Sequence, residues 1–187
     1  MLMLKNVRIS YPELFKKVAF KDGTPKFSGT FLLEAGSEQE KAVKAAILKV
    51  AKEAFGDTAE NILKKTQKTE RRLLKIGNDK TNDDGEVANG YEDMLYIKGS
   101  NKGNIRVVNR DRSDIEENEG VIYSGCYVNA QLDIWAQDND WGKFINCKLL
   151  AVQFWADGEK LGGDGGESAD IDAFESADIL EADDIPW

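Results

Sequence analysis

Two long stretches of alternating apolar and polar residues constrain the fold more than any other part of the sequence. They are "SGCYVNAQLDIWA" (124–136) and "GKFINCKLLAVQFWA" (142–156), and they flank the turn-rich "QDNDW". This pattern predicts a long β-hairpin. One face of its first strand carries Cys126, Val128, Ala130, Leu132, Ile134 and Ala136, and the other face carries Tyr127, Asn129, Gln131, Asp133 and Trp135. The first face is expected in the core, so the sheet must bury it against something.

Shorter alternating stretches supply the remaining strands, in "LKNVRIS", "KFSGTFLLE", "EDMLYIKG" and "NIRVVNR". Ser37 followed by Glu40 forms a capping box, which predicts a principal helix over about 38–55. A shorter second helix is expected from Asp57 toward Lys65. Strands on both sides of one helical interruption indicate a mainly β chain of the α+β class. We expect a small closed or partly closed barrel of about five principal strands, with extra strands.

Charge divides the chain into two parts. The 187 residues carry a formal net charge of −9, yet residues 164–187 hold nine acidic side chains and no Lys or Arg. Removing those nine from the 34 acidic residues leaves 25, which equals the 25 Lys and Arg of the rest. The segment from 162 opens with four glycines in five residues and is then too polar to form a core. We therefore expect a domain over 1–161 and a flexible acidic tail over 162–187.

Several kinds of chemistry are excluded by residue type. The chain has no histidine, which removes the commonest general base and zinc ligand. The oxygen-rich "GNDKTNDDGEVANG" fails as a calcium loop, because Asp84 stands where the sharp turn needs glycine. Cys126 and Cys147 lie in apolar strands and are expected to be buried and reduced. No nucleotide-binding fingerprint is present, so we expect no enzyme, no metal site and no cofactor.

No stretch of the sequence resembles a membrane span or a signal peptide. No run of 18 apolar residues occurs, and Lys5 and Arg8 interrupt the start "MLMLKNVRIS". We therefore expect a protein that is neither exported nor bound to a membrane.

Basic residues gather in three groups, around 5–26, 64–75 and 98–112, and aromatic residues are interleaved with them. Binding single strands without reading their sequence requires cations that contact the phosphate backbone and aromatic rings that stack on the bases. The stacking candidates are Tyr11, Phe15, Tyr96, Tyr127 and Trp135. The phosphate-contact candidates are Arg8, Lys16, Lys17, Lys26, Arg71, Arg72, Lys98, Lys102, Arg106 and Arg110. For each aromatic residue, packing beneath a loop or helix is the alternative.

The body resembles a family of bacteriophage single-stranded DNA-binding proteins with an OB-fold. The resemblance rests on "ISYPELF", "GYEDMLYIKGSNKGNIRVVNRD", "YSGCYVNAQLDIWA" and "LLAVQFWADGEKLGG", which together cover most of residues 8–163 in order. It implies an OB-fold-like five-stranded barrel with extra strands and an acidic tail. It also implies single-stranded DNA as the partner, a role in phage DNA replication or recombination, and the cytoplasm of the bacterial host as the location.

The last five residues, "DDIPW", are similar to the acidic tip of bacterial single-stranded DNA-binding proteins, which ends in D-D-I-P-F. The matching residues are Asp183, Asp184, Ile185, Pro186 and Trp187. This resemblance implies that the tip binds replication or recombination proteins, with Ile185 and Trp187 as apolar anchors beside the terminal carboxylate. The oligomeric state is left open, a homo-oligomer included.

Two other readings of the sequence stay open. The chain could be an acidic DNA mimic or inhibitor that occupies the groove of a host nuclease, or a virion assembly protein. Neither would bind DNA, and the basic and aromatic interleaving of the body argues against both.

Overall fold

The computed structural model describes residues 1–21 and 23–161, so the expected tail and its tip lie outside the described residues. The elements in chain order are β1 (Leu2–Val18), β2 (Lys26–Glu34), α1 (Glu38–Phe55), η1 (Gly56–Thr58), α2 (Ala59–Thr66), β3 (Leu74–Ile76), η2 (Gly77–Asp79), β4 (Met94–Asn101), β5 (Arg106–Val108), η3 (Glu117–Glu119), β6 (Tyr127–Asn139) and β7 (Gly142–Ala156). Both expected helices are present, and a 3-10 turn separates them. In the described residues, no helix has the length and apolar character needed to cross a membrane.

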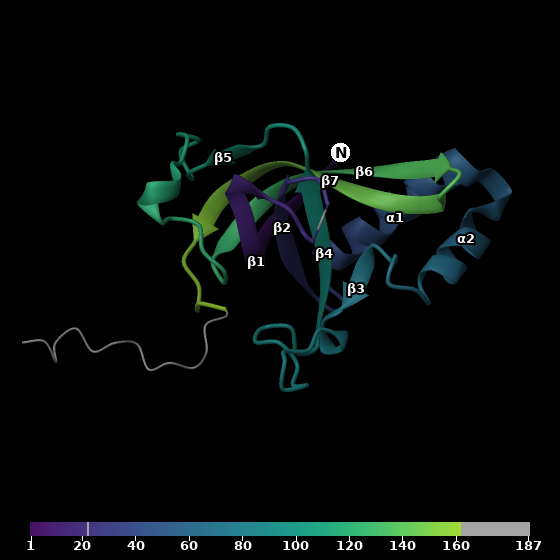
Figure 1. Cartoon of the computed structure of the whole chain (residues 1–187), viewed down its shortest axis with the longest axis horizontal. Coiled ribbons are helices and arrows are strands. Elements are labelled where there is room, and N and C mark those ends of the chain that lie inside the picture. Colours follow the sequence, from purple (N-terminus) through teal and green to yellow (C-terminus); the bar gives the residue numbers. More distant parts are fainter. Residues whose placement is uncertain (22, 162–187) are drawn as a thin grey trace, which may run out of the picture.

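The strands form one sheet in the order β3-β4-β2-β1-β6-β7-β5, and a parallel pairing of Ser100 with Lys148 joins β4 to β7. This pairing closes β1, β2, β4, β7 and β6 into a five-stranded barrel, with β3 and β5 as additions (Figure 1). In chain order, the barrel strands are β1, β2, β4, β6 and β7. Strand β2 is an antiparallel neighbour of both β1 and β4, and the fifth strand, β7, lies between the third, β4, and the fourth, β6. This is the connectivity of an OB-fold, as the resemblance implied.

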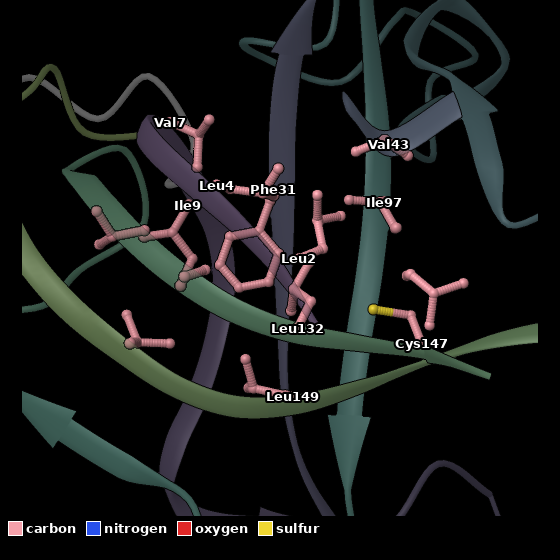
Figure 2. Packing of buried hydrophobic residues seen from close by; sticks show 14 of the residues in the cluster. Leu2, Leu4, Val7, Ile9, Phe31, Val43, Ile97, Leu132, Cys147 and Leu149 are labelled. Carbon is pink, nitrogen blue, oxygen red and sulfur yellow. The ribbon is translucent and has the colours of Figure 1, made fainter. Parts of the chain in front are cut away.

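The barrel interior is filled by the apolar face of each strand. Fully buried residues from all five barrel strands meet there, among them Ile9, Phe31, Ile97, Leu132 and Leu149 (Figure 2). The apolar face predicted for β6 is buried from Cys126 to Ile134, and the free Cys126 and Cys147 are both buried. Burial raises the pKa of the Cys147 thiol to about 12, so this sulfur acts as a core group.

Helix α1 packs against the barrel beside β1, β2 and β6. The Ser37 hydroxyl accepts a hydrogen bond from the Glu40 amide, which caps the first turn as the sequence predicted. Val43, Ala51 and Phe55 are buried on the face that meets the barrel. In Figure 1, α1 and α2 lie at the end of the molecule toward which the β6–β7 hairpin extends, and β5 lies at the other end.

Candidate nucleic-acid interface

A cleft of about 1410 Å³ lies over the second and third strands of the barrel. Ser28 and Thr30 of β2 and Lys98 and Ser100 of β4 line it. The β1–β2 connection, the arms of the β6–β7 hairpin and the segment 71–75 before and within β3 also line it. In an OB-fold, this face and the loops that flank it are where oligonucleotides bind.

The lining of the cleft is strongly basic. Eight cationic residues line it, namely Lys26, Arg71, Arg72, Lys75, Lys80, Lys98, Lys102 and Lys148. Only two carboxylates, Glu13 and Asp133, line it with them. Within the described residues, Arg72 alone of the eight forms an ion pair, with Asp79 of η2. Seven cations are therefore free to contact an anionic ligand, in a concave site that concentrates their field.

Four aromatic side chains share the cleft with these cations. Tyr11, Phe20 and Trp135 line it and are 54%, 81% and 43% exposed. Tyr96 is half-buried, and its ring meets the buried Tyr91 edge to face, with centroids 5.2 Å apart at 83°. Rings held in a cleft with an open face are stacking platforms for unpaired bases.

Tyr11 is held in an uncommon backbone conformation. Its φ is 48°, and the pairing of β1 with β2 shifts register between Ser10 and Glu13. A β-bulge of this kind redirects a side chain, and a bulky residue at positive φ is rare and strained. The Lys80 ammonium lies 5.1 Å from the Tyr11 ring centroid. The bulge thus turns Tyr11 toward the cleft, where the residue remains 54% exposed beside the Lys80 ammonium.

Trp135 reaches the cleft because it belongs to the polar face of β6. It pairs across the hairpin with Asn146, and Asp133 pairs with Lys148 on the same face. The Arg71 guanidinium, which lines the cleft, lies 4.5 Å from the centroid of the Phe144 ring on β7. This contact joins the segment 71–75 to the hairpin.

Two groups in the cleft have shifted pKa values. Desolvation lowers the pKa of Lys98, and the nearby Lys80 lowers it further. Desolvation also raises the pKa of Tyr96. Both shifts indicate a cleft lining that is partly removed from water, where a phosphate beside a lysine is worth more than on an open surface.

The structure brings eight of the sequence-predicted residues into the cleft. They are the aromatic residues Tyr11, Tyr96 and Trp135 and the cations Lys26, Arg71, Arg72, Lys98 and Lys102. The other seven lie outside its lining, namely Phe15, Tyr127, Arg8, Lys16, Lys17, Arg106 and Arg110. The tip residues Asp183 to Trp187 are not among the described residues.

The residues outside the cleft are engaged with other parts of the protein. Arg8 donates hydrogen bonds to the carbonyl oxygens of Gly125 and Glu159, at 3.2 and 2.6 Å, and lies 5.9 Å over the Tyr127 ring. Phe15 packs against the core.

The four remaining cations also have partners near them. Lys16 pairs with Glu117 and Arg106 with Asp114, at 3.2 and 3.1 Å. Lys17 lies 5.4 Å from the Phe27 ring, and Arg110 lies 4.9 Å from the Trp155 ring.

Four further residues line the cleft that the sequence did not single out, namely Phe20, Lys75, Lys80 and Lys148. Lys75 lies in the basic group 64–75 and Phe20 in the basic and aromatic group 5–26, so the sequence pattern could have identified both as candidates. Lys148 is one cation in a mostly apolar strand, and Lys80 lies in an acid-rich loop. Only strand pairing and loop position bring these two into the site.

The barrel has OB-fold connectivity, and a basic cleft lined with aromatic residues lies over its second and third strands. These features define the class of OB-fold proteins that bind single-stranded nucleic acids. Within that class, the chain belongs to the family described as "Enterobacter phage Enc34, ssDNA-binding protein", whose model matches residues 1–185.

Individual proteins are also similar to this chain. "Putative protein p50" of Acyrthosiphon pisum secondary endosymbiont phage 1 is 31% identical over 188 residues, covering 98% of this chain and 97% of that protein. The solved single-stranded DNA-binding protein of bacteriophage Enc34 in complex with single-stranded DNA is 29% identical. It has a TM-score of 0.58 and covers 86% of this chain and 88% of that one. The single-stranded DNA-binding protein gp2.5 of bacteriophage T7 has a TM-score of 0.54 at 14% identity, covering 96% and 98%, which shows the shared fold alone.

Proposed function

We propose that this protein binds single-stranded DNA in the cleft without reading its sequence and takes no part in catalysis. The single observation that carries the proposal is the lining, in which eight cations face two carboxylates beside four aromatic rings. Cations at this density neutralise a phosphate backbone, and rings with an open face stack on any base. An acidic DNA mimic would need the opposite charge on its working surface. Membership of the phage family and the DNA complex of the Enc34 protein support the same conclusion.

The direct test compares a labelled oligothymidylate with a duplex of the same length, using the full chain and fluorescence anisotropy. Tighter binding of the single strand is expected, because a paired base cannot present its face to Trp135 or Tyr11. Binding should weaken steeply as salt rises, since released counterions drive it. Absence of binding to oligothymidylate in low-salt buffer would overturn the proposal, as would equal affinity for the duplex.

The finer part of the proposal concerns the biological setting. We propose that residues 1–161 form the DNA-binding domain and protect unpaired strands in phage replication or recombination, in the cytoplasm of the bacterial host. Residues 162–187 would then form an acidic arm, whose tip Asp183–Trp187 binds replication or recombination proteins. The segregation of nine acidic residues into 164–187, against equal numbers of acids and bases before it, supports this division.

A peptide of residues 178–187 tests the tip in extract of infected host cells. It should retain replication or recombination enzymes, identified by mass spectrometry, while the same peptide with Trp187→Ala should not. Deleting 164–187 from the chain should leave DNA binding intact and tighten it at low salt, because the acidic arm no longer competes with DNA for the cleft. Equal retention by both peptides, or loss of DNA binding on deletion, would contradict this division of labour.

A further inference from the structure

A second basic surface lies outside the cleft, on α2 and the turn that follows it, and we call its three lysines the α2 lysines. Lys64, Lys65 and Lys68, with Asn61, line a shallow hollow of about 280 Å³. All three lysines are exposed, and none forms an ion pair with any other described residue.

Helix α1 shows how such lysines are normally neutralised. Its Lys41, Lys44 and Lys49 pair with glutamates three or four residues away on the same helix. Pairs at this spacing lower the local charge and stabilise a helix. In helix α2, Glu60 is the one acidic residue and stands four residues before Lys64, but among the described residues it forms no ion pair with these lysines. Its cations are therefore available to a ligand.

The lysines of α2 are held on a fixed support. Ala59 is buried, and Ile62 and Leu63 pack against the core, so the helix is anchored by its apolar face. The Thr66 hydroxyl donates to the carbonyl oxygens of Ile62 and Leu63, both at 3.0 Å. The anchored helix holds the backbone of Lys64 and Lys65 in place, and Lys68 follows in the turn after it. All three side chains line the same hollow.

The segment 67–72 links the hollow to the cleft along the chain. Consecutive turns join it, with the Thr69 amide donating to the Thr66 carbonyl and the Arg72 amide to the Thr69 carbonyl. They place Lys68, which lines the hollow, one turn before Arg71, which lines the cleft and lies over Phe144. A strand that leaves the cleft past Arg71 next meets Lys68, then Lys65 and Lys64.

We propose that the α2 lysines hold the phosphate backbone of the same single strand after it leaves the cleft, so that the DNA path extends beyond the barrel. This inference rests on the proposed function. Among residues 1–21 and 23–161, no aromatic or apolar side chain lines the hollow. These residues therefore offer no base a stacking surface and no folded partner the apolar anchor that protein interfaces need. What it offers is ammonium groups on flexible stems, which suit a chain of phosphates.

The test uses the full chain and oligothymidylates of about 4 to 16 nucleotides, the range that one OB-fold accommodates. In the variant Lys64→Ala/Lys65→Ala/Lys68→Ala, binding of the shortest strands should match that of the unaltered protein. Binding of the longest should weaken on the order of tenfold at low salt, with a salt slope smaller by about 2. The length beyond which affinity stops rising should become shorter.

Two control variants make the result specific. Lys41→Ala/Lys49→Ala/Lys52→Ala removes the same charge from α1 and should not change the length dependence. Lys64→Arg/Lys65→Arg/Lys68→Arg keeps the charge and should retain it. An equal loss at every length, or no loss at any length, would overturn the inference and leave the cleft proposal standing. If the unaltered protein binds no oligothymidylate at all, the proposed function itself fails.

Discussion

The cleft and the β5 end of the barrel carry similar side chains but present them differently. We define the β5 end by Arg8, Tyr127, Arg110 and Trp155, which lie in or beside β1, β5, β6 and β7. There, each arginine lies over a ring, and Arg8 also donates to two carbonyl oxygens. In the cleft, seven of eight cations form no ion pair with any described residue. Two of these seven, Arg71 and Lys80, also lie over rings. The hydrogen bonds of Arg8 to carbonyl oxygens therefore mark the clearest difference between the two regions.

This difference teaches that residue type alone does not locate a binding surface. A cation that already satisfies a carboxylate or a carbonyl oxygen must lose that contact before it can bind a phosphate, which offsets most of the gain. A cation without such a contact loses only water. The cleft is therefore expected to bind, and the β5 end to hold the C-terminal end of β7 and the residues after it in place.

The largest effect expected is on the cations. Replacing Lys26, Lys98 and Lys102 together with alanine should weaken oligothymidylate binding on the order of a hundredfold at low salt and lower the salt slope by about 2. A matched triple variant, Lys16→Ala/Lys17→Ala/Arg106→Ala, removes the same charge outside the cleft and should leave the slope unchanged. Salt titrations monitored by anisotropy measure both. Equal slopes for the two variants would erase the distinction between cleft and surface.

The aromatic residues give the next largest effect. Trp135→Ala should cost about 1–3 kcal/mol of binding free energy, the usual value of one stacked base. Trp155→Ala removes a tryptophan of similar exposure at the β5 end and should leave DNA affinity unchanged. Trp155→Ala variants that bind as poorly as Trp135→Ala would place a stacking site where the structure has a ring covered by Arg110.

The aromatic candidates also show how far the sequence alone could reach. In the alternating stretch "EDMLYIKG", Leu95 and Ile97 pack in the core, and the candidates Tyr96 and Lys98 line the cleft on the opposite face. Alternation also gave Tyr127 and Trp135 one face of β6. Alternation along a strand shows which face of the sheet a side chain lies on, but not which end of the barrel it is near. Strand β6 is 13 residues long and has two register shifts against β7. Tyr127 consequently lies at the β5 end and Trp135 in the cleft.

Five of the ten cation candidates line the cleft and five do not, for a different physical reason. The ion-pair partners of Lys16 and Arg106 are Glu117 and Asp114, in and beside the connection that holds η3. No periodic pattern relates Lys16 in the N-terminal strand to Glu117, because tertiary folding alone brings them together. Arg106 and Asp114 are eight residues apart and meet across the turn after β5. The strands other than β3, both helices and the barrel were predictable from local patterns, whereas the selection of cations without ion pairs needed the fold.

A smaller effect is expected at the one cleft cation that has an ion-pair partner. Asp79→Asn removes the carboxylate paired with Arg72 and should tighten DNA binding by up to about 1 kcal/mol, since exposed ion pairs are weak. The counterpart at the β5 end, Asp114→Asn, frees Arg106 and should not alter affinity. Competition titrations between labelled and unlabelled strands resolve differences of this size. Tighter binding by the Asp114→Asn variant would show that Arg106 can contact DNA once its ion pair is removed.

The smallest effect is a change in protonation at Lys98. Because its pKa lies below the ordinary lysine value of 10.5 in the free protein, and a nearby phosphate favours the charged form, DNA binding should raise that pKa. At a pH between the free and bound values, the bound state holds more protons, so binding takes up a fraction of a proton and affinity falls as pH rises through that window. Below the free value, both states are protonated and no uptake is expected.

Calorimetric titrations in two buffers of different ionisation enthalpy measure this uptake directly. The Lys98→Arg variant should bind without it, because a guanidinium stays charged throughout, while Lys102→Arg should keep it. This readout is specific to Lys98 of β4, whose pKa partial desolvation lowers, and a general loss of charge does not imitate it. Uptake that persists in the Lys98→Arg variant would assign the proton to another group and would contradict a phosphate contact at Lys98.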